Sequence, residues 1–132
     1  IKSPEIRISL FERAKSLGFN FPVICSHLSY LSKSAQIGEG TILLHGSLIN
    51  TSARVGANCI INTNALIEHD AEIGAHCHVS TGAIINGGAK IDDRCFIGSG
   101  CIVNENVRIG SNSVMASGQI IRKDIPSGSV IK

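Results

Sequence analysis

The chain has 132 residues, a formal net charge of +2 and 43% hydrophobic residues, with no Trp, one Tyr and four Phe. The near-neutral charge does not favour nucleic-acid binding, and no run of about 18 apolar residues indicates a membrane span. The length fits one domain, whose core has to be built from Ile, Val, Leu and Ala.

The beginning of the chain predicts a helix and then a short strand. Ser3 and Pro4 supply a cap and a first-turn proline, and Gly18 is a stop signal. Apolar residues at helical spacing form one stripe, which comprises Ile6, Leu10, Phe11, Ala14 and Leu17. Residues 21–25 are typical of a strand. We interpret residues 1–34 as the tail of a preceding α/β domain, and the chain as a piece of a longer protein.

From residue 35 onward the sequence repeats every six residues, which is typical of stacked coils. One column is aliphatic or Met throughout and comprises Ile37, Leu43, Ile49, Val55, Ile61, Ile67, Ile73, Val79, Ile85, Ile91, Ile97, Val103, Ile109, Met115 and Ile121. The column two residues earlier is mostly small, from Ala35 to Gln119. Two positions separated by two residues point to the same side of a strand, so both columns are predicted to face inward.

Three six-residue units make one coil of 18 residues, and residues 35–126 are predicted to form about five coils stacked about 4.8 Å apart. The expected fold class is all-β, a parallel β-helix. Its left-handedness is implied by resemblance to known β-helices, because parallel crossovers are normally right-handed. Gly38, Gly56, Gly74 and Gly110 recur every 18 residues or a multiple of it, and we expect them at turns that need a positive φ. Residues 127–132 are the expected start of a C-terminal tail.

The five cysteines are an odd number without CxxC spacing, so they do not indicate a disulfide framework. Cys59, Cys77, Cys95 and Cys101 fall on the small inward column, where a buried thiol acts as a small apolar side chain. Only Cys25 lies outside this pattern. Reduced thiols favour a cytoplasmic location.

Residues just before the large inward positions should point outward, in three columns of five. The first column is Ile42, Ile60, His78, Phe96 and Val114; the second is Leu48, Leu66, Ile84, Ile102 and Ile120; the third is Gln36, Arg54, Glu72, Lys90 and Arg108. Only the third is a normal solvated surface. Two apolar surfaces are more exposed hydrocarbon than a monomer usually carries, and a closed three-fold ring would cover both. We therefore expect a homotrimer; the alternative is that another domain covers one surface.

The segment Glu68-His69-Asp70 places three ionisable side chains at one predicted turn. Eighteen residues later, Gly87 and Gly88 would lie directly over His69 and Asp70 and leave space there. A histidine oriented by a carboxylate, beside open backbone N–H groups, is the arrangement of a general base next to an oxyanion site. The alternative is a solvated turn below a plain glycine loop, and both interpretations stay open on these residues alone.

The remaining polar positions give weaker indications. Thr63, Thr81, Ser99 and Ser117 form a column of small residues that would suit a long, thin pantetheine arm. His78 interrupts the first apolar column and is either functional or a structural histidine. The spacing of the histidines does not match the zinc site of γ-class carbonic anhydrases, so we predict no metal.

The stretch from Ile60 to Thr63, the Glu68-His69-Asp70 segment, Ile73-Gly74, His78-Val79-Ser80 and Gly87 together resemble one family. It is the sialic acid O-acetyltransferase and UDP-4-amino-sugar N-acetyltransferase family of hexapeptide-repeat acyltransferases. The resemblance spans about residues 20–130. The Glu-His-Asp segment with a histidine nine residues later is fairly specific within these proteins, whereas the hexapeptide repeat is not.

The resemblance implies a role for each matching residue. His69 matches the general base and Asp70 the acid that assists it. His78 and Gly87 match contacts to acetyl-CoA near its thioester and acetyl group, and Asn62 matches an asparagine near the acceptor. Ser99 and Ser117 fall where the family lines its CoA groove. The resemblance further implies acetyl-CoA as donor, no metal, and a homotrimer with sites between subunits.

Two departures from the family concern the ends of the chain. Family members usually carry an N-terminal Rossmann-like domain that binds the nucleotide-sugar, and its Gly-rich loop is absent here. They usually also continue with a Gly-Asn-Pro-Ala-like segment that helps to cover CoA. The expected function is transfer of an acetyl group to an amine or hydroxyl of a sugar in bacterial surface glycan synthesis. The alternatives are a non-enzymatic β-helix scaffold and a metal-dependent hydratase.

Overall fold

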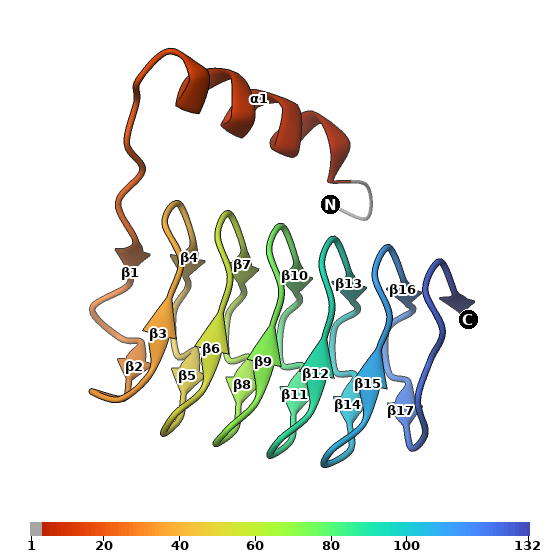
Figure 1. Cartoon of the computed structure of the whole chain (residues 1–132). Coiled ribbons are helices and arrows are strands. Elements are labelled where there is room, and N and C mark those ends of the chain that lie inside the picture. Colours follow the sequence, from red (N-terminus) through yellow and green to blue (C-terminus); the bar gives the residue numbers. More distant parts are fainter. Residues whose placement is uncertain (1–3) are drawn as a thin grey trace.

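Each 18-residue coil of the chain consists of three two-residue strands joined by short turns. Strands in successive coils stack in register, so paired residues are 18 apart in the sequence. The computed structural model describes residues 4–132, which form a parallel β-solenoid of about six turns with one helix beside it (Figure 1). The predicted parallel β-helix is therefore confirmed. The chain has three sheets, which we call A, B and C, and we name the turns between them A–B, B–C and C–A.

The strands alternate among the three sheets in chain order. Sheet A contains β1 (Ile24–Cys25), β4 (Ile42–Leu43), β7 (Ile60–Ile61), β10 (His78–Val79), β13 (Phe96–Ile97), β16 (Val114–Met115) and β18 (Val130–Ile131). Sheet B contains β2 (Tyr30–Leu31), β5 (Leu48–Ile49), β8 (Leu66–Ile67), β11 (Ile84–Ile85), β14 (Ile102–Val103) and β17 (Ile120–Ile121). Sheet C contains β3 (Gln36–Ile37), β6 (Arg54–Val55), β9 (Glu72–Ile73), β12 (Lys90–Ile91) and β15 (Arg108–Ile109).

The solenoid is longer than the predicted range of 35–126. β1 pairs with β4 at one end, and β16 pairs with β18 at the other. The six-residue step continues backward to Leu31 and Cys25, which explains the additional strands at the beginning of the chain. Residues 127–132, expected as a tail, contribute the last strand of sheet A.

The core is one column of large side chains beside one column of small ones, as predicted. Leu43, Ile61, Val79 and Ile97 are fully buried in sheet A, and the equivalent positions in sheets B and C are buried with few exceptions. Cys59, Cys77, Cys95 and Cys101 are buried free thiols and Cys25 is exposed, which confirms their assignment from the repeat.

The buried thiols also have a hydrogen-bonding role at the C–A turns. Cys59 Sγ donates to Gly74 O (3.1 Å), Cys77 Sγ to Asp92 O (3.1 Å) and Cys95 Sγ to Gly110 O (3.2 Å). These carbonyl groups belong to the next coil. The thiols of Cys59 and Cys77 thus satisfy acceptors that would otherwise face the core unpaired, whereas the Gly110 carbonyl also accepts from Ser113 Oγ at 2.6 Å. The hydrogen bond with the Cys59 thiol, together with burial, raises the pKa of Cys77 well above its ordinary value, so it stays a donor.

The recurrent glycines are needed for a different reason from the one predicted. Gly38, Gly56 and Gly74 do not have a positive φ; positive φ occurs two residues later, for example at Gly40 and at Asn58. A Cβ on Gly56 would lie only 2.6 Å from the backbone nitrogen of the next coil, and the other C–A glycines are similar. Close approach of stacked backbones therefore excludes a side chain there.

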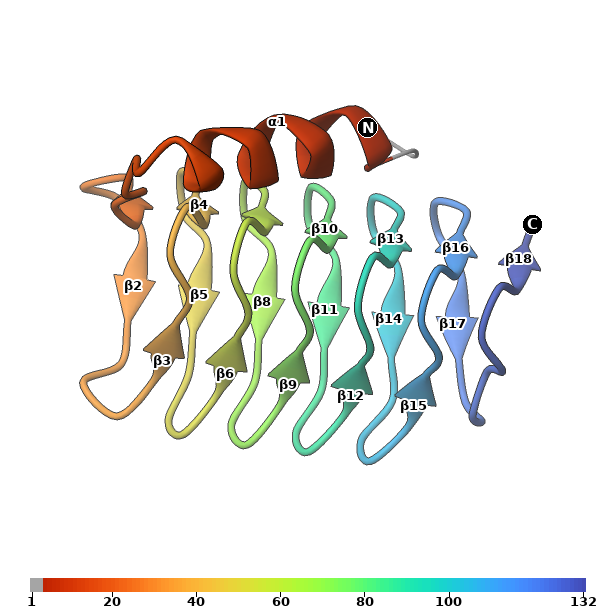
Figure 2. The same cartoon turned by 45° about the horizontal axis from the view of Figure 1, so that its top comes forward.

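The helix α1 (Glu5–Ser16) lies along the solenoid over the C–A turns (Figure 2). Gly18 follows the helix with φ 87°, as expected of its stop signal, whereas Pro4 occupies the N-cap instead of the predicted first turn; Ser3, the predicted cap, lies outside the described residues. Arg7 donates to the carbonyl groups of Asn58 and His76, which lie in the C–A turns of two neighbouring coils. These hydrogen bonds hold α1 against the solenoid.

The predicted apolar stripe of α1 is mostly not buried in this chain. Phe11 is buried against Phe21 and His76, whereas Ile6 is 78% exposed and Leu10 60% exposed. The spacing of the stripe was correct, but only its centre meets the solenoid. No helix in the described part of the chain is long and apolar enough to cross a membrane.

Candidate functional site

The B–C turn after β8 carries the Glu68-His69-Asp70 segment. Asp70 has φ 59°, a left-handed conformation that Asp and Asn tolerate better than most residues. This conformation brings its carboxylate back to the preceding side chain, where Asp70 Oδ2 lies 2.9 Å from His69 Nδ1. A carboxylate can only accept a hydrogen bond, so Nδ1 is the donor, and in the neutral form of the imidazole the lone pair is therefore on Nε2. The structure thus contains an oriented imidazole whose basic nitrogen is free of this contact.

Glu68 stabilises the same turn from the other side. Asn50 Nδ2 donates to Glu68 Oε2 at 2.9 Å, and the His69 N–H donates to the same oxygen at 3.3 Å. The carboxylate of Glu68 therefore caps the backbone of His69. The side chains of His69 and Asp70 remain 64% and 67% exposed, so both are accessible to a ligand.

Gly87 leaves a gap directly over the basic edge of His69. A Cβ at Gly87 would lie 2.7 Å from both Cε1 and Nε2 of the imidazole, so this edge faces the glycine. The gap is part of a hollow of about 570 Å³. Its lining residues are Glu68, His69, Asp70, Asn86, Gly87, Gly88, Glu105 and Asn106. The predicted stacking of Gly87 over His69 and of Gly88 over Asp70 agrees with the observed 18-residue register.

The other predicted site residues lie together on a different part of the solenoid. His78 points outward from sheet A but is only 9% exposed, and its ring packs edge-on against Phe96 at 5.2 Å. Asn62 Nδ2 lies 3.4 Å from His78 Nε2. Ser99 Oγ lies 3.0 Å from Ser80 Oγ on the A–B turns, in the column that Ser117 continues.

The chain therefore holds two separate groups of predicted site residues. His69, Asp70 and Gly87 occupy B–C turns, whereas Asn62 and His78 belong to sheet A and the A–B turns that follow it. Sheet B lies between the two groups. A single chain does not bring them to one reacting centre.

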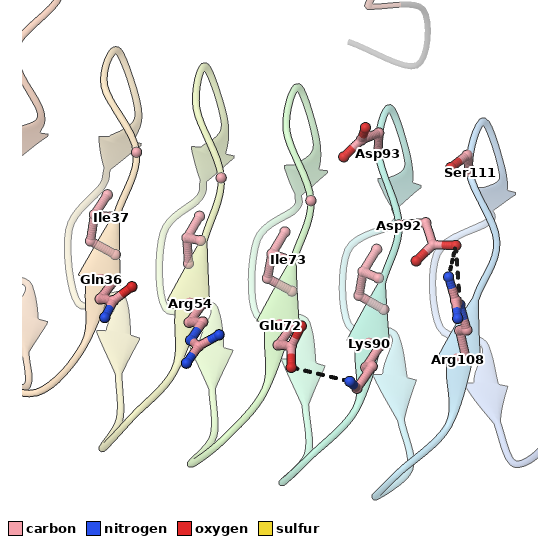
Figure 3. A pocket seen from close by; sticks show the side chains of 15 residues that line it. Gln36, Ile37, Arg54, Glu72, Ile73, Lys90, Asp92, Asp93, Arg108 and Ser111 are labelled. Carbon is pink, nitrogen blue, oxygen red and sulfur yellow. Dashed lines mark hydrogen bonds and ion pairs between the residues drawn. The ribbon is translucent and has the colours of Figure 1, made fainter.

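Two other hollows are lined by none of the predicted site residues. The hollow along sheet C has a volume of about 720 Å³, and its floor is a ladder of charged side chains (Figure 3). Lys90 pairs with Glu72 at 3.2 Å and Arg108 with Asp92 at 2.9 Å, so these charges largely satisfy one another. The hollow beside α1 is lined by apolar side chains that include Ile6 and Leu10. Within residues 4–132 no group of three or more His, Cys, Asp or Glu side chains is placed to hold a metal ion.

The family described as bacterial transferase hexapeptide (six repeats) matches residues 52–87, which include the Glu68-His69-Asp70 turn. The six-residue repeat of the matched segment continues through the three sheets of the solenoid on both sides of it. The predicted resemblance to sugar acetyltransferases is likewise confirmed by comparison with solved structures. No curated protein sequence matches significantly.

Several solved structures superimpose on nearly the whole of this chain. The acetyltransferase domain of PglB from Neisseria gonorrhoeae is 30% identical, with a TM-score of 0.95 over 98% of this chain and 63% of its own. PerB from Caulobacter crescentus, in complex with CoA and GDP-perosamine, gives the same identity, coverage and TM-score. WeeI from Acinetobacter baumannii, at 23% identity and a TM-score of 0.93 over 98% of this chain and 64% of its own, shows the shared fold. The chain thus spans slightly less than two thirds of these relatives.

The structure adds residues that were not singled out from the sequence. Asn86, Glu105 and Asn106 line the hollow around His69. Glu105 occupies the same turn column as His69, two coils later, so the 18-residue step contained the signal for it. No pattern in the sequence indicated that the Asn86 amide donates to the Val103 carbonyl in the next coil.

Proposed function

We propose that this chain is the catalytic β-helix of an acetyltransferase that uses acetyl-CoA as donor and a nucleotide-sugar as acceptor. The observation that supports this most directly is the basic Nε2 edge of His69, oriented by Asp70, beneath the space that Gly87 leaves. PerB is solved with CoA and GDP-perosamine, and a second PglB structure contains acetyl-CoA. Both ligand classes are thus bound by proteins of this fold at about 30% identity.

The proposed reaction is direct transfer within a ternary complex. The acceptor nitrogen or oxygen attacks the thioester carbonyl carbon, and His69 Nε2 takes the proton that the acceptor releases. The carbonyl π electrons move onto oxygen and return when the C–S bond breaks. The sulfur then takes the proton from the imidazolium and leaves as CoA thiol. The buried cysteines are unsuited to a covalent intermediate because they face the core.

The charge around His69 favours an amine as acceptor. Glu68, Asp70 and Glu105 line the hollow, and no Lys or Arg is among its described lining residues. Three carboxylates attract an ammonium group and repel the carboxylate of a sialic-acid-like sugar. We therefore propose that the acceptor is an amino sugar and that the product is an N-acetylated sugar. The proposed setting is surface glycan synthesis in the cytoplasm.

We also propose that the complete site forms between copies in a homotrimer. Within one chain, sheet B separates the His69 group from the His78 group. The outward residues of sheet B are apolar, and Ile120 is 46% exposed. A neighbouring copy packed on this surface would cover it and bring a second set of site residues toward His69.

The N-terminal part of the chain supports the proposal of a preceding domain. Leu17 and Phe19 are 68% and 62% exposed after α1, and Leu28 and Tyr30 are 59% and 57% exposed in the first coil. We propose that these side chains meet a domain that binds the nucleotide-sugar, with residues 1–34 as its tail.

The first experiment titrates acetyl-CoA into the wild type, His78→Ala and His69→Ala by calorimetry, with sedimentation to determine the oligomeric state. We expect binding to the wild type, weaker binding to His78→Ala and nearly unchanged binding to His69→Ala. Transfer to GDP-perosamine, followed by thiol release, should then be lost in His69→Ala. A wild type that binds no acetyl-CoA at millimolar concentration would favour the non-enzymatic scaffold instead.

A further inference from the structure

Within residues 4–132, the A–B turns form an edge of the solenoid that carries no Asp, Glu, Lys or Arg side chain. The ten Asp and Glu residues lie instead on α1, on sheet C and on the B–C and C–A turns. Across the described A–B turns, the side chains that can carry a positive charge are those of His27, after β1, and His45, after β4. An anion that approaches this edge therefore meets no carboxylate, and the two histidines at its N-terminal end are the groups that can bind it.

His27 and His45 lie one above the other in the first two coils, after the first two strands of sheet A (Figure 1). β1 and β4 pair in register, so the two histidines occupy equivalent positions 18 residues apart. Their ring centroids lie 6.3 Å apart at an interplanar angle of 76°, and both residues are exposed. Neither ring has a hydrogen-bond or ion-pair partner in the described part of the chain. The ring nitrogens are therefore available to a ligand that bridges the two coils.

The geometry of this pair suits a diphosphate. Protonated imidazoles donate to phosphate oxygens in short, charge-assisted hydrogen bonds. The two phosphates together are about as long as the rise of one coil, about 4.8 Å, so one molecule can reach both rings. The backbone N–H groups of His27 and His45 also have no partner within residues 4–132, and they add two donors. A metal ion fits the pair less well, because no third His, Cys, Asp or Glu of the described chain is placed to complete its coordination.

We infer that His27 and His45 form a binding site for the diphosphate of the nucleotide-sugar acceptor. This inference rests on the proposed function and on the expected contact of His78 with the thioester. β10, which carries His78, lies two coils above β4, a distance of about 10 Å along the solenoid. A hexose ring and its glycosidic oxygen span most of that distance, so an amine that reacts beside His78 leaves its diphosphate at the level of His45. Ser99 and Ser117 lie on the opposite side of His78, toward the C-terminal end, where CoA is expected.

The test titrates inorganic pyrophosphate and GDP-perosamine into the wild type, His27→Gln, His45→Gln and the double variant by calorimetry. Glutamine keeps a polar side chain but cannot become cationic, and both positions are exposed, so the melting temperature should not change. We expect the Kd for both ligands to rise in each single variant and to rise about tenfold or more in the double variant. His45→Arg retains a cation and should bind pyrophosphate at least as tightly as the wild type, a rescue that a merely structural role of the ring would not give.

Lys33→Gln is the matched control, because Lys33 is an exposed cation on the B–C turn of the same coil as His27. Its Kd values should stay within about twofold of those of the wild type. An equal loss of affinity in Lys33→Gln would mean that only the overall charge matters, and it would overturn the inference. Unchanged affinity in the double variant, or a wild type that binds neither ligand at millimolar concentration, would also overturn it.

Acetyl-CoA also contains a diphosphate, so the same variants are titrated with it. We expect its Kd to be unchanged, and in acetyl transfer we expect the KM for GDP-perosamine to rise about tenfold with little change in kcat. Loss of affinity for acetyl-CoA but not for GDP-perosamine would assign the pair to the donor and refute the inference. Histidine-dependent binding of GDP-perosamine in a protein without transfer activity would support the inference and refute the proposed function.

Discussion

The substitution Gly87→Ala tests the geometry of the proposed site with one methyl group. The added Cβ would lie 2.7 Å from Cε1 and Nε2 of His69, whereas ordinary contacts begin near 3.4 Å, so the imidazole must retreat by about 0.7 Å. Gly87 does not have a positive φ, and its only close neighbour is this side chain. The backbone can therefore accept alanine, and the imidazole has to move.

The expected consequence is a large loss of rate with little loss of stability. Moving the ring breaks the 2.9 Å contact between His69 Nδ1 and Asp70 and displaces Nε2 from the acceptor. Misplacing a catalytic group by about 1 Å can cost about 10²-fold, and general-base catalysis contributes about 10²- to 10⁴-fold. We expect kcat to fall about 10²-fold or more. The free energy of unfolding should change by less than about 1 kcal/mol, because the His69 side chain can swing into solvent.

A double-mutant cycle with His69→Ala makes this prediction specific. In the His69→Ala background the added methyl group meets no imidazole, so Gly87→Ala should have little further effect on kcat. Thiol release from acetyl-CoA in the presence of GDP-perosamine measures the rates, and urea denaturation measures stability. Full activity of Gly87→Ala, or an equal loss in both backgrounds, would refute the assigned role of the gap over His69.

Three further predictions concern neighbouring features. Asp70→Asn retains the left-handed turn but loses the charge, so we expect kcat to fall about tenfold. Asp70→Ala also strains the turn and should lower the free energy of unfolding by about 1 kcal/mol, measured by urea denaturation. Cys77→Ala loses the donor to the Asp92 carbonyl and should cost about 1–3 kcal/mol, while Cys77→Ser keeps a donor and should cost less in the same assay. Burial, and then the charge of Arg7, lower the pKa of His76 in the folded state, so its contribution to stability is present above about pH 6.5 and lost as the pH falls further. His76→Asn should remove this pH dependence from the unfolding midpoint.

The sequence was sufficient to predict the faces of the solenoid because one register determines them all. Ile60, His78 and Phe96 are paired neighbours in sheet A, as their 18-residue spacing predicted. The same register placed Gly87 over His69. A repeat of this kind converts sequence distance directly into spatial distance, because residues 18 apart lie side by side in one sheet.

The features that the sequence did not predict depend on choices the repeat leaves open. A recurring glycine is compatible both with positive φ and with close approach of a neighbouring backbone, and at Gly56 the structure shows close approach without positive φ. The spacing of Ile6 and Leu10 predicted an apolar helix face but not what covers it. The amide of Asn86 can either accept from the next N–H or donate to the next coil, and the sequence is the same in both cases.

The position of His69 on a turn explains how the proposed general base and a regular core can coexist in this fold. The inward columns hold the sheets together through Ile67, Ala71 and their equivalents, while the turn residues between them face solvent. Asp70 uses a turn conformation that recurs, with positive φ, at Ser52 below and Gly88 above. The site therefore needs no distortion of the solenoid, and its substitutions should alter rate far more than stability. Substitutions on the inward columns should do the reverse.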